Sequence, residues 1–182
     1  MANALTLSGS IRKNSHNGRL ASFVGEKLAL AGMEVNNIDL KDYPLALFNA
    51  DEEENCATPE SAVKLAEMFA KADIIFIASP EYNGSLSPLL KNTLDWISRQ
   101  RVKPYHRAIF GVGAASTGKM GGIGGLAHLR EILGKMGALV APASLGVGFS
   151  NQAFDENKRL LDKPTNQRAD MLVEQLMSIS RS

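Results

Sequence analysis

Short apolar runs alternate along the chain with longer stretches in which apolar residues recur every three or four positions. The clearest run is Asp73–Ser79. It is apolar on both of its faces, which is typical of a parallel strand covered by helices on two sides. Similar runs predict four further strands, at Ala4–Leu7, Glu34–Ile38, Ala108–Gly113 and Ala138–Ala141. The periodic stretches predict helices at Asn17–Ala31, Pro59–Lys71, Ser87–Ser98, Gly124–Met136 and Thr165–Ile179.

Residues that favour helix ends lie at several of these boundaries. Pro88 fits the first turn of its helix, and Gly32 and Gly137 directly follow two predicted helix ends. Thr58 is expected to cap the helix that follows it. The segment Asp39–Thr58 shows no periodicity, so we expect it to be irregular.

Strands that alternate with helices predict an α/β fold, with one parallel sheet and helices on both faces. A chain of 182 residues with no repeat and no clear linker is expected to form one domain, residues 1–182. Five strands at this length suit the flavodoxin-like order 2-1-3-4-5 better than a six-stranded dinucleotide-binding sheet.

The loop after the first predicted strand carries chemistry suited to an anion. Ser10, Arg12, Ser15 and Asn17 offer hydroxyls, a guanidinium and an amide just before a predicted helix, whose first N–H groups point the same way. An arginine can place two N–H groups on two phosphate oxygens. A polar surface turn with a helix cap explains this loop equally well when it is taken alone.

Two further loops follow the third and fourth predicted strands. Pro80, Glu81, Tyr82 and Asn83 combine an aromatic ring with backbone and amide groups, which suits a flat heteroaromatic ligand, although the tyrosine could instead pack on neighbouring helices. Since ligands of open α/β sheets bind at the carboxyl ends of strands, the loops are expected to share one site.

The loop after the fourth strand is small, polar and rich in glycine, so its backbone can approach a ligand closely. It contains Ser116, Thr117 and Gly118. The segment from Gly113 to Lys119 also fits most of a P-loop pattern, but Met120 stands where that pattern needs a hydroxyl for magnesium. Nucleoside triphosphate binding is therefore not expected there.

Together the three loops resemble the signatures of the NAD(P)H-dependent FMN reductases, a family that includes soluble quinone, azo-dye and chromate reductases. The matching motifs are Gly9-Ser10-x-Arg12-x-x-Ser15-x-Asn17, then Pro80-Glu81-Tyr82-Asn83 followed by Leu90-Lys91-Asn92-x-x-Asp95-Trp96, then Ser116-Thr117-Gly118 with Gly121-Gly122 and Leu129-Arg130. The likeness spans about residues 4 to 141. One departure is Ser87-Pro88, where the family usually has Pro-Gly.

The resemblance implies a site and a reaction. Its first motif implies that Ser10, Arg12, Ser15 and Asn17 hold the phosphate of a bound FMN. Its second implies that Pro80, Glu81, Tyr82 and Asn83 line the ribityl chain and the isoalloxazine. Its third implies that Ser116, Thr117 and Gly118 touch the pyrimidine edge of the ring.

The reaction implied is an NAD(P)H:acceptor oxidation by a ping-pong mechanism. Quinones, azo compounds, chromate or free flavin would be the small-molecule electron acceptors. The family also implies a homodimer or a dimer of dimers. Two other classes stay open, namely a flavodoxin-like electron carrier and a flavin-binding sensor, although the near-neutral charge argues against a strongly acidic carrier.

Composition limits the partners. The chain has 20 Lys and Arg against 19 Asp and Glu, a net charge of +1, so neither a nucleic acid nor an anionic membrane is expected to bind it. Its one cysteine, Cys56, excludes an internal disulfide and is expected to be an ordinary free thiol. We see neither a signal peptide nor a long apolar stretch, so we expect a cytoplasmic protein. With one cysteine and scattered histidines, no bound metal is expected.

A few polar clusters fall outside the three loops. The acidic run Asp51–Glu54 is expected to be a solvated loop, and the histidines at 16, 106 and 128 lack metal-ligand spacing. His16 lies in the first loop, where it could face either a ligand or the solvent. Arg99, Arg101 and Lys103 could select a 2′-phosphate or pair across a subunit interface, but a solvated helix end is the simpler interpretation.

Overall fold

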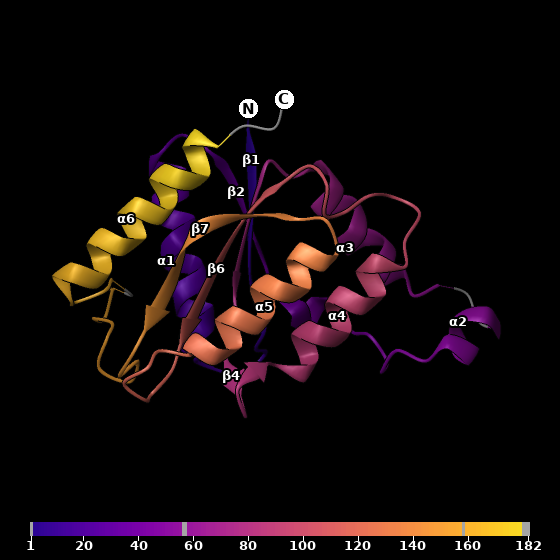
Figure 1. Ribbon diagram of the computed structural model, residues 1–182, viewed down its shortest axis with the longest axis horizontal. Helices are drawn as coiled ribbons and strands as arrows, with labels where there is room; N and C mark the ends of the chain where they lie inside the picture. The colour runs from indigo at the N-terminus through magenta and orange to yellow at the C-terminus, as the bar shows by residue number, and fades with distance from the viewer. Residues whose placement is uncertain (1, 56–57, 158, 180–182) are drawn as a thin grey trace.

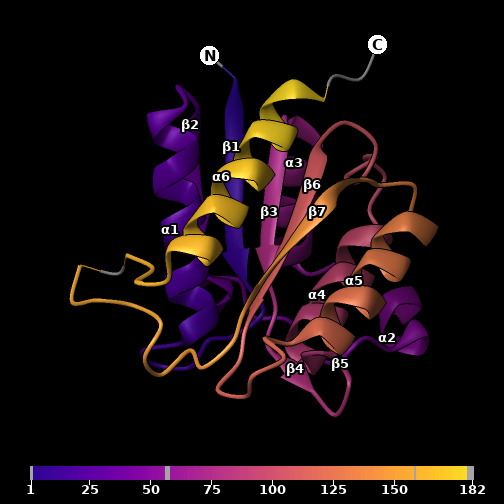
Figure 2. The same cartoon turned by 60° about the vertical axis from the view of Figure 1, so that its left-hand side comes forward.

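A five-stranded parallel sheet forms the centre of the molecule (Figures 1 and 2). The computed structural model describes residues 2–55, 58–157 and 159–179. The strand order is β2-β1-β3-β6-β7. The strands are β1 (Asn3–Ser8), β2 (Glu34–Ile38), β3 (Ile74–Ala78), β6 (Ile109–Ala115) and β7 (Leu139–Val147). In order of appearance in this sheet they follow 2-1-3-4-5, so the predicted fold class and topology are confirmed.

Helices cover both faces of the sheet, and each face has its own apolar cluster. On one face lie α1 (His16–Leu30) and α6 (Lys163–Ser178); on the other lie α3 (Glu60–Lys71), α4 (Pro88–Ser98) and α5 (Ile123–Lys135). The buried side chains of β3 belong to both clusters, as its doubly apolar sequence predicts. A 3₁₀ turn, η1 (Leu40–Asp42), and a short helix, α2 (Ala50–Asn55), complete the helical elements.

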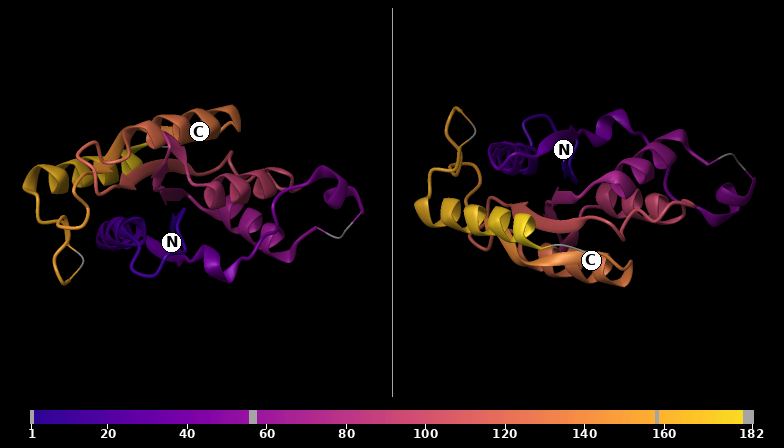
Figure 3. Two further views of the ribbon diagram at one scale, coloured as in Figure 1. Left: turned by 90° about the horizontal axis from the view of Figure 1, so that it is seen from below. Right: turned by 90° about the horizontal axis from the view of Figure 1, so that it is seen from above.

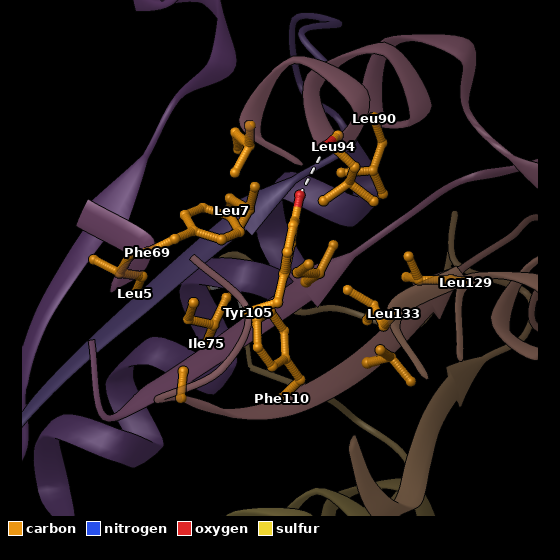
Figure 4. Close-up of a cluster of buried hydrophobic side chains, with 14 of the residues drawn as sticks. Leu5, Leu7, Phe69, Ile75, Leu90, Leu94, Tyr105, Phe110, Leu129 and Leu133 are labelled. Atoms are coloured by element: carbon orange, nitrogen blue, oxygen red, sulfur yellow. Dashed lines mark hydrogen bonds between the residues drawn. The ribbon is translucent and has the colours of Figure 1, made fainter. Parts of the chain in front are cut away.

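Tyr105 shows how a polar group is accommodated in the second of these layers (Figure 4). Its ring packs near Phe69 and Phe110, and its hydroxyl donates a hydrogen bond of 2.8 Å to the carbonyl of Leu94. Burial raises the pKa of this phenol, and the nearby Asp95 adds to the effect. Tyr105 therefore acts as a neutral donor that joins the loop before β6 to α4.

Four local expectations differ from the structure. β7 runs on to Val147 instead of ending at Ala141, because Pro142 interrupts the apolar pattern but is tolerated in an edge strand. Thr58 is not a cap, since Pro59 occupies that position without a side-chain hydrogen bond. The segment expected to be irregular contains η1 and α2. The acidic run within it lies in α2, where Glu53 pairs with Arg99 at 2.9 Å.

The second predicted loop is a small hairpin formed by β4 (Glu81–Tyr82) and β5 (Ser85–Leu86). Asn83 and Gly84 make its turn with φ angles of 52° and 80°. Both angles lie in the left-handed region, as the two central residues of a tight hairpin turn require. The hairpin leaves the end of β3 and leads directly into α4.

Candidate functional site

Three loops meet at the carboxyl edge of β1, β3 and β6, which are neighbours in the sheet. The strand order reverses between β1 and β3, where open α/β sheets bind their ligands. Between the loops lies a cavity of about 160 Å³, which we call the inner cavity. Its lining comprises Ser10, Arg12, Ser15, His16, Asn17, Pro80, Glu81, Tyr82, Ala115, Ser116 and Thr117.

The inner cavity thus collects every predicted site residue except Asn83 and Gly118. Asn83 is exposed at the turn of the hairpin, and Gly118 is exposed on the third loop beyond the lining. The sequence leaves the role of His16 open and places Ala115 in the third loop without selecting it as a site residue, and both line the cavity. The only sequence signal for His16 is its position within the first motif. Ala115 lines the cavity because β6 ends at this residue.

The first loop forms an anion-accepting end to this cavity. Ser15 caps α1, and its hydroxyl accepts a hydrogen bond of 3.2 Å from the N–H of Gly18. The chain is turned just before by Asn14, whose φ of 58° is left-handed. The first N–H groups of α1 therefore face the loop without intrahelical partners, and the positive end of the helix dipole favours an anion beside them.

Asn17 links the first loop to the third. Its side chain is buried, with its Nδ2 donating to the carbonyl of Ala115 at 2.9 Å and its Oδ1 accepting from the N–H of Ala115 at 2.8 Å. Both of its polar atoms are thus engaged with the end of β6, whereas the resemblance implied that Asn17 holds the phosphate. The side chain of Asn17 positions the two loops relative to each other, and its backbone belongs to the first turn of α1.

Ser87 links the first loop to the second. Its hydroxyl donates to the carbonyl of Gly9 at 2.6 Å and accepts from the N–H of Leu90 at 3.2 Å, so it also caps α4. A Cβ at Gly9 would lie 2.9 Å from this hydroxyl, too close for any larger residue without a shift. The departure from the family pattern at Ser87-Pro88 therefore provides both a helix cap and a connection between loops.

The second and third loops are held by the elements behind them. Glu81 turns its carboxylate to the N-terminus of α5, where Oε2 accepts a hydrogen bond of 2.8 Å from the N–H of Gly125. Tyr82 stays 51% exposed, at the rim of the cavity. Ser116 is bound through its backbone to Val147 and Ser150, both at 3.0 Å. Hydrogen bonds to the elements behind them therefore hold the second and third loops in place.

Positive charge is concentrated at the first loop. Arg12 is exposed and makes no ion pair with any of the residues described. Burial lowers the pKa of His16, and the charges of Arg19 and Arg12 lower it further. The Nδ1 atom of His16 is buried and has no hydrogen-bond partner within the described part of the chain. Among the described residues, a buried nitrogen without a hydrogen-bond partner and two arginines thus lie near this end of the site.

This donor set fits a phosphate-bearing planar cofactor such as FMN. Hydroxyls, a guanidinium and helix N–H groups suit the phosphate, while Tyr82 and the backbone of the third loop suit a flat ring. Sites for drug-sized ligands typically measure roughly 300–1,000 Å³, so the inner cavity would enclose only part of such a cofactor and the ring would lie along the exposed rim.

Comparison with known proteins decides the family. The family model for NADPH-dependent FMN reductases matches residues 2–152. The chain belongs to this family. It is also 35% identical over 164 residues to a quinone reductase of Escherichia coli, covering 88% of this chain and 86% of that protein. The family predicted from the three motifs is confirmed, and with it the oxidoreductase class and the use of FMN and NAD(P)H.

Solved structures agree on the fold. A flavoenzyme NAD(P)H:(acceptor) oxidoreductase from Paracoccus denitrificans superposes with a TM-score of 0.80 at 24% identity, covering 97% of this chain and 98% of that one. A flavodoxin from Streptococcus pneumoniae superposes with a TM-score of 0.62 at 13% identity, covering 98% and 99%. These likenesses establish the flavodoxin-like architecture of this family member.

The described residues also bear on metal and membrane as partners. Within residues 2–55, 58–157 and 159–179, no three His, Cys, Asp or Glu side chains are grouped so that they could hold a metal ion. Over the same residues, no helix has both the length and the apolar character that a membrane span requires. The cysteine at position 56 lies outside the described residues.

Proposed function

We propose that this protein is an NAD(P)H:quinone oxidoreductase that carries FMN in the inner cavity and works by a ping-pong mechanism. The observation that carries the proposal is the convergence of three loops on one cavity. Its lining includes the start of α1, the half-exposed Tyr82, and Arg12, which makes no ion pair with a described residue. When bound, FMN supplies a ring that accepts a hydride and passes on two electrons.

Each residue has a role that its surroundings support. Ser10, Ser15 and Arg12, with the N–H groups of α1, hold the phosphate. Asn17 keeps the first and third loops in register, since its amide spans them. Glu81 orients the second loop through α5.

The remaining predicted residues lie around the ring. Pro80 and Tyr82 border it, with Asn83 shaping the turn beside them. Ser116, Thr117 and Gly118 approach its pyrimidine edge. Because Tyr82 is half exposed at the rim, the donor and the acceptor bind there in turn, which gives ping-pong kinetics.

The quinone is favoured among the acceptors because the Escherichia coli relative is named for it. Azo compounds, chromate and free flavin are proposed as secondary acceptors. We further propose a single domain over residues 1–182, assembled as a homodimer or a dimer of dimers, in the cytoplasm, where NAD(P)H is available. Light scattering of the purified protein tests the assembly.

The decisive experiment is an anaerobic titration of the flavin-loaded protein. NADH or NADPH should bleach the flavin absorbance, and a water-soluble quinone should restore it over many cycles. Double-reciprocal plots at several quinone concentrations should be parallel. A flavin that stays oxidised with both nicotinamides would refute the reductase and favour an electron carrier, and bleaching without quinone turnover would favour a sensor.

A further inference from the structure

A second and much larger cavity lies beside the first loop. It has a volume of about 990 Å³, and we call it the outer cleft. Its walls are the carboxyl ends of β1 and β2, the first turns of α1, and residues 154–156 from the segment between β7 and α6. Figures 2 and 3 show this segment projecting beside the first half of α1. Ser10, Arg12 and Ser15 line both the outer cleft and the inner cavity, so the two spaces adjoin.

The floor of the outer cleft is polar. Thr6 and Ser8 both line it from β1, and they are only 1% and 8% exposed. The hydroxyl of Thr6 is hydrogen-bonded to the side chain of Asn37, whereas the Oγ atom of Ser8 has no partner among the described residues. A buried hydroxyl without a partner destabilises the folded protein, and a polar ligand in contact with Ser8 would offset that cost.

The lining of the cleft also includes an aromatic ring. Phe154 is half-buried against the cluster beneath α1 and α6, and it is held by a bridge to Leu160. Ile38 and Ile11 add apolar surface to the lining. An aromatic ring in the lining suits a planar heterocycle such as a purine.

Four cations surround this floor, and they lie free of acidic partners. Arg12, Lys13, Arg19 and Lys41 line the cleft, and none of them makes a side-chain hydrogen bond or ion pair with another described residue. Three carboxylates, Asp39, Asp155 and Glu156, also line the cleft, so the cations exceed the acidic groups by one and an anionic ligand would balance that excess.

The carboxylates of the cleft are partly occupied by backbone N–H groups. Asp39 accepts from the N–H of Lys41 at 3.0 Å, and Asp155 accepts from the N–H of Arg159 at 2.8 Å. Glu156 is the third acidic residue of the lining. Asp39 also follows directly after β2, the position from which a carboxylate receives ribose hydroxyls in dinucleotide-binding sheets.

We propose that the outer cleft binds the adenosine diphosphate half of the nicotinamide co-substrate. The purine lies against Phe154, the ribose hydroxyls reach Asp39, and the phosphates meet Lys13, Arg19 and Lys41. The cleft adjoins the inner cavity along the first loop, so one molecule would pass over that loop and the bound phosphate to reach the exposed rim at Tyr82. This assignment rests on the proposed function, because it names where the donor of that reaction is held.

The test measures binding of ADP, which has no nicotinamide and cannot react, to the flavin-loaded protein by titration calorimetry. One ADP should bind per chain and compete with NAD(P)H. Inorganic pyrophosphate should bind at least about tenfold more weakly than ADP, since it lacks the nucleoside. Equal affinity for the two ligands, or no heat with millimolar ADP, would overturn the proposal.

Variants locate the binding. The double variant Lys13→Ala/Lys41→Ala should raise the ADP dissociation constant about tenfold or more and leave the FMN dissociation constant within about twofold. Phe154→Ala should weaken ADP more than pyrophosphate. The matched control is Lys103→Ala, an exposed lysine before β6 at the opposite edge of the sheet, which should change neither constant.

These outcomes separate the two proposals. Affinity for ADP that is unchanged in the double variant would overturn the assignment of the cleft, even if NAD(P)H still bleaches the flavin. Failure of NAD(P)H to bleach the flavin would instead refute the reductase, while the calorimetry would still decide whether the cleft binds ADP.

Discussion

Replacing Asn17 by alanine tests whether the site depends on the connection between its first and third loops. The substitution removes two hydrogen bonds, of 2.9 and 2.8 Å, that join the start of α1 to the end of β6. The two residues are separated by 98 positions in sequence, so no local structure replaces the connection. Both the free energy of unfolding and the FMN affinity should therefore fall.

The magnitude follows from burial. Asn17 is 3% exposed and Ala115 is 5% exposed, so the alanine variant leaves a buried N–H and a buried carbonyl of Ala115 without these partners. Each such group costs about 1–3 kcal/mol, and water entering the space left by the amide would reduce that cost. We expect a loss of about 2–5 kcal/mol in the free energy of unfolding, a large share of the roughly 5–15 kcal/mol that stabilises a typical domain.

Urea unfolding gives the stability and a flavin fluorescence titration gives the FMN dissociation constant. Asn92→Ala is the matched control, because the amide of Asn92 also bridges backbone groups, the N–H of Phe48 and the carbonyl of Ala46, away from the three loops. The control should lose stability and keep its FMN affinity. The reasoning is refuted if Asn17→Ala loses less than about 1 kcal/mol, or if both variants bind FMN equally well.

Three further predictions concern the same edge of the sheet. Arg12→Ala should weaken FMN binding by about 1.5–3 kcal/mol, the scale of a charged hydrogen bond, and Arg101→Ala should not; equal dissociation constants would show that the first loop does not hold the phosphate. Gly122→Ala should destabilise the protein in urea more than Gly32→Ala. Both glycines have left-handed φ angles, of 78° and 92°, but only at Gly122 would a Cβ meet another atom, at 2.7 Å; similar losses would contradict this. The pKa of His16 lies below 6.5 in the cofactor-free protein, so this histidine favours folding above pH 6.5 and the advantage is lost as pH falls through the lowered pKa. Bound FMN should raise that pKa in an NMR titration, and no upward change would place the phosphate elsewhere.

The sheet could be predicted because its central strands are short runs of apolar residues. Ile74–Ala78 is fully buried and reads as a continuous apolar run, so its central place and its parallel partners follow. The length of β7 could not be predicted from Ala138–Ala141, since Pro142 ends the apolar pattern. It does not end the strand, which lies at the edge of the sheet and needs fewer backbone hydrogen bonds.

The sequence contains a signal for the hairpin after β3, but hydrophobic periodicity does not reveal it. Asn83-Gly84 is the strongest short-range hairpin signal when it stands between two strands, but each strand here has only two residues. Strands this short produce no alternation to detect. The sequence correctly predicts that Asn83 and Gly84 lie in a loop at the end of β3, but it does not predict the geometry of their turn.

The positions of the loops that line the inner cavity can be predicted from the sequence, whereas the hydrogen bonds that connect these loops cannot. Each loop follows a strand, so its place at the carboxyl edge comes from the fold alone. The pairing of Asn17 with Ala115, and that of Ser87 with Gly9, joins residues far apart in sequence, and no spacing rule identifies such partners. Phe154 is the extreme case, because the segment that brings it to the outer cleft has no periodicity at all.

The distribution of charge explains how a nearly neutral protein can attract an anionic co-substrate. Net charge is +1, yet some exposed cations elsewhere are paired, as Arg99 is with Glu53 and Arg107 is with Asp73. Lys13, Arg19 and Lys41 of the outer cleft make no ion pair with a described residue and lie at one edge of the sheet, next to the positive end of α1, where the acidic residues of the same lining offset part of their charge. The screening length at physiological salt is about 8 Å, so these charges act mainly on a ligand close to the cleft. The attraction is therefore local, and association with NAD(P)H should slow as ionic strength rises while the bulk charge stays near zero.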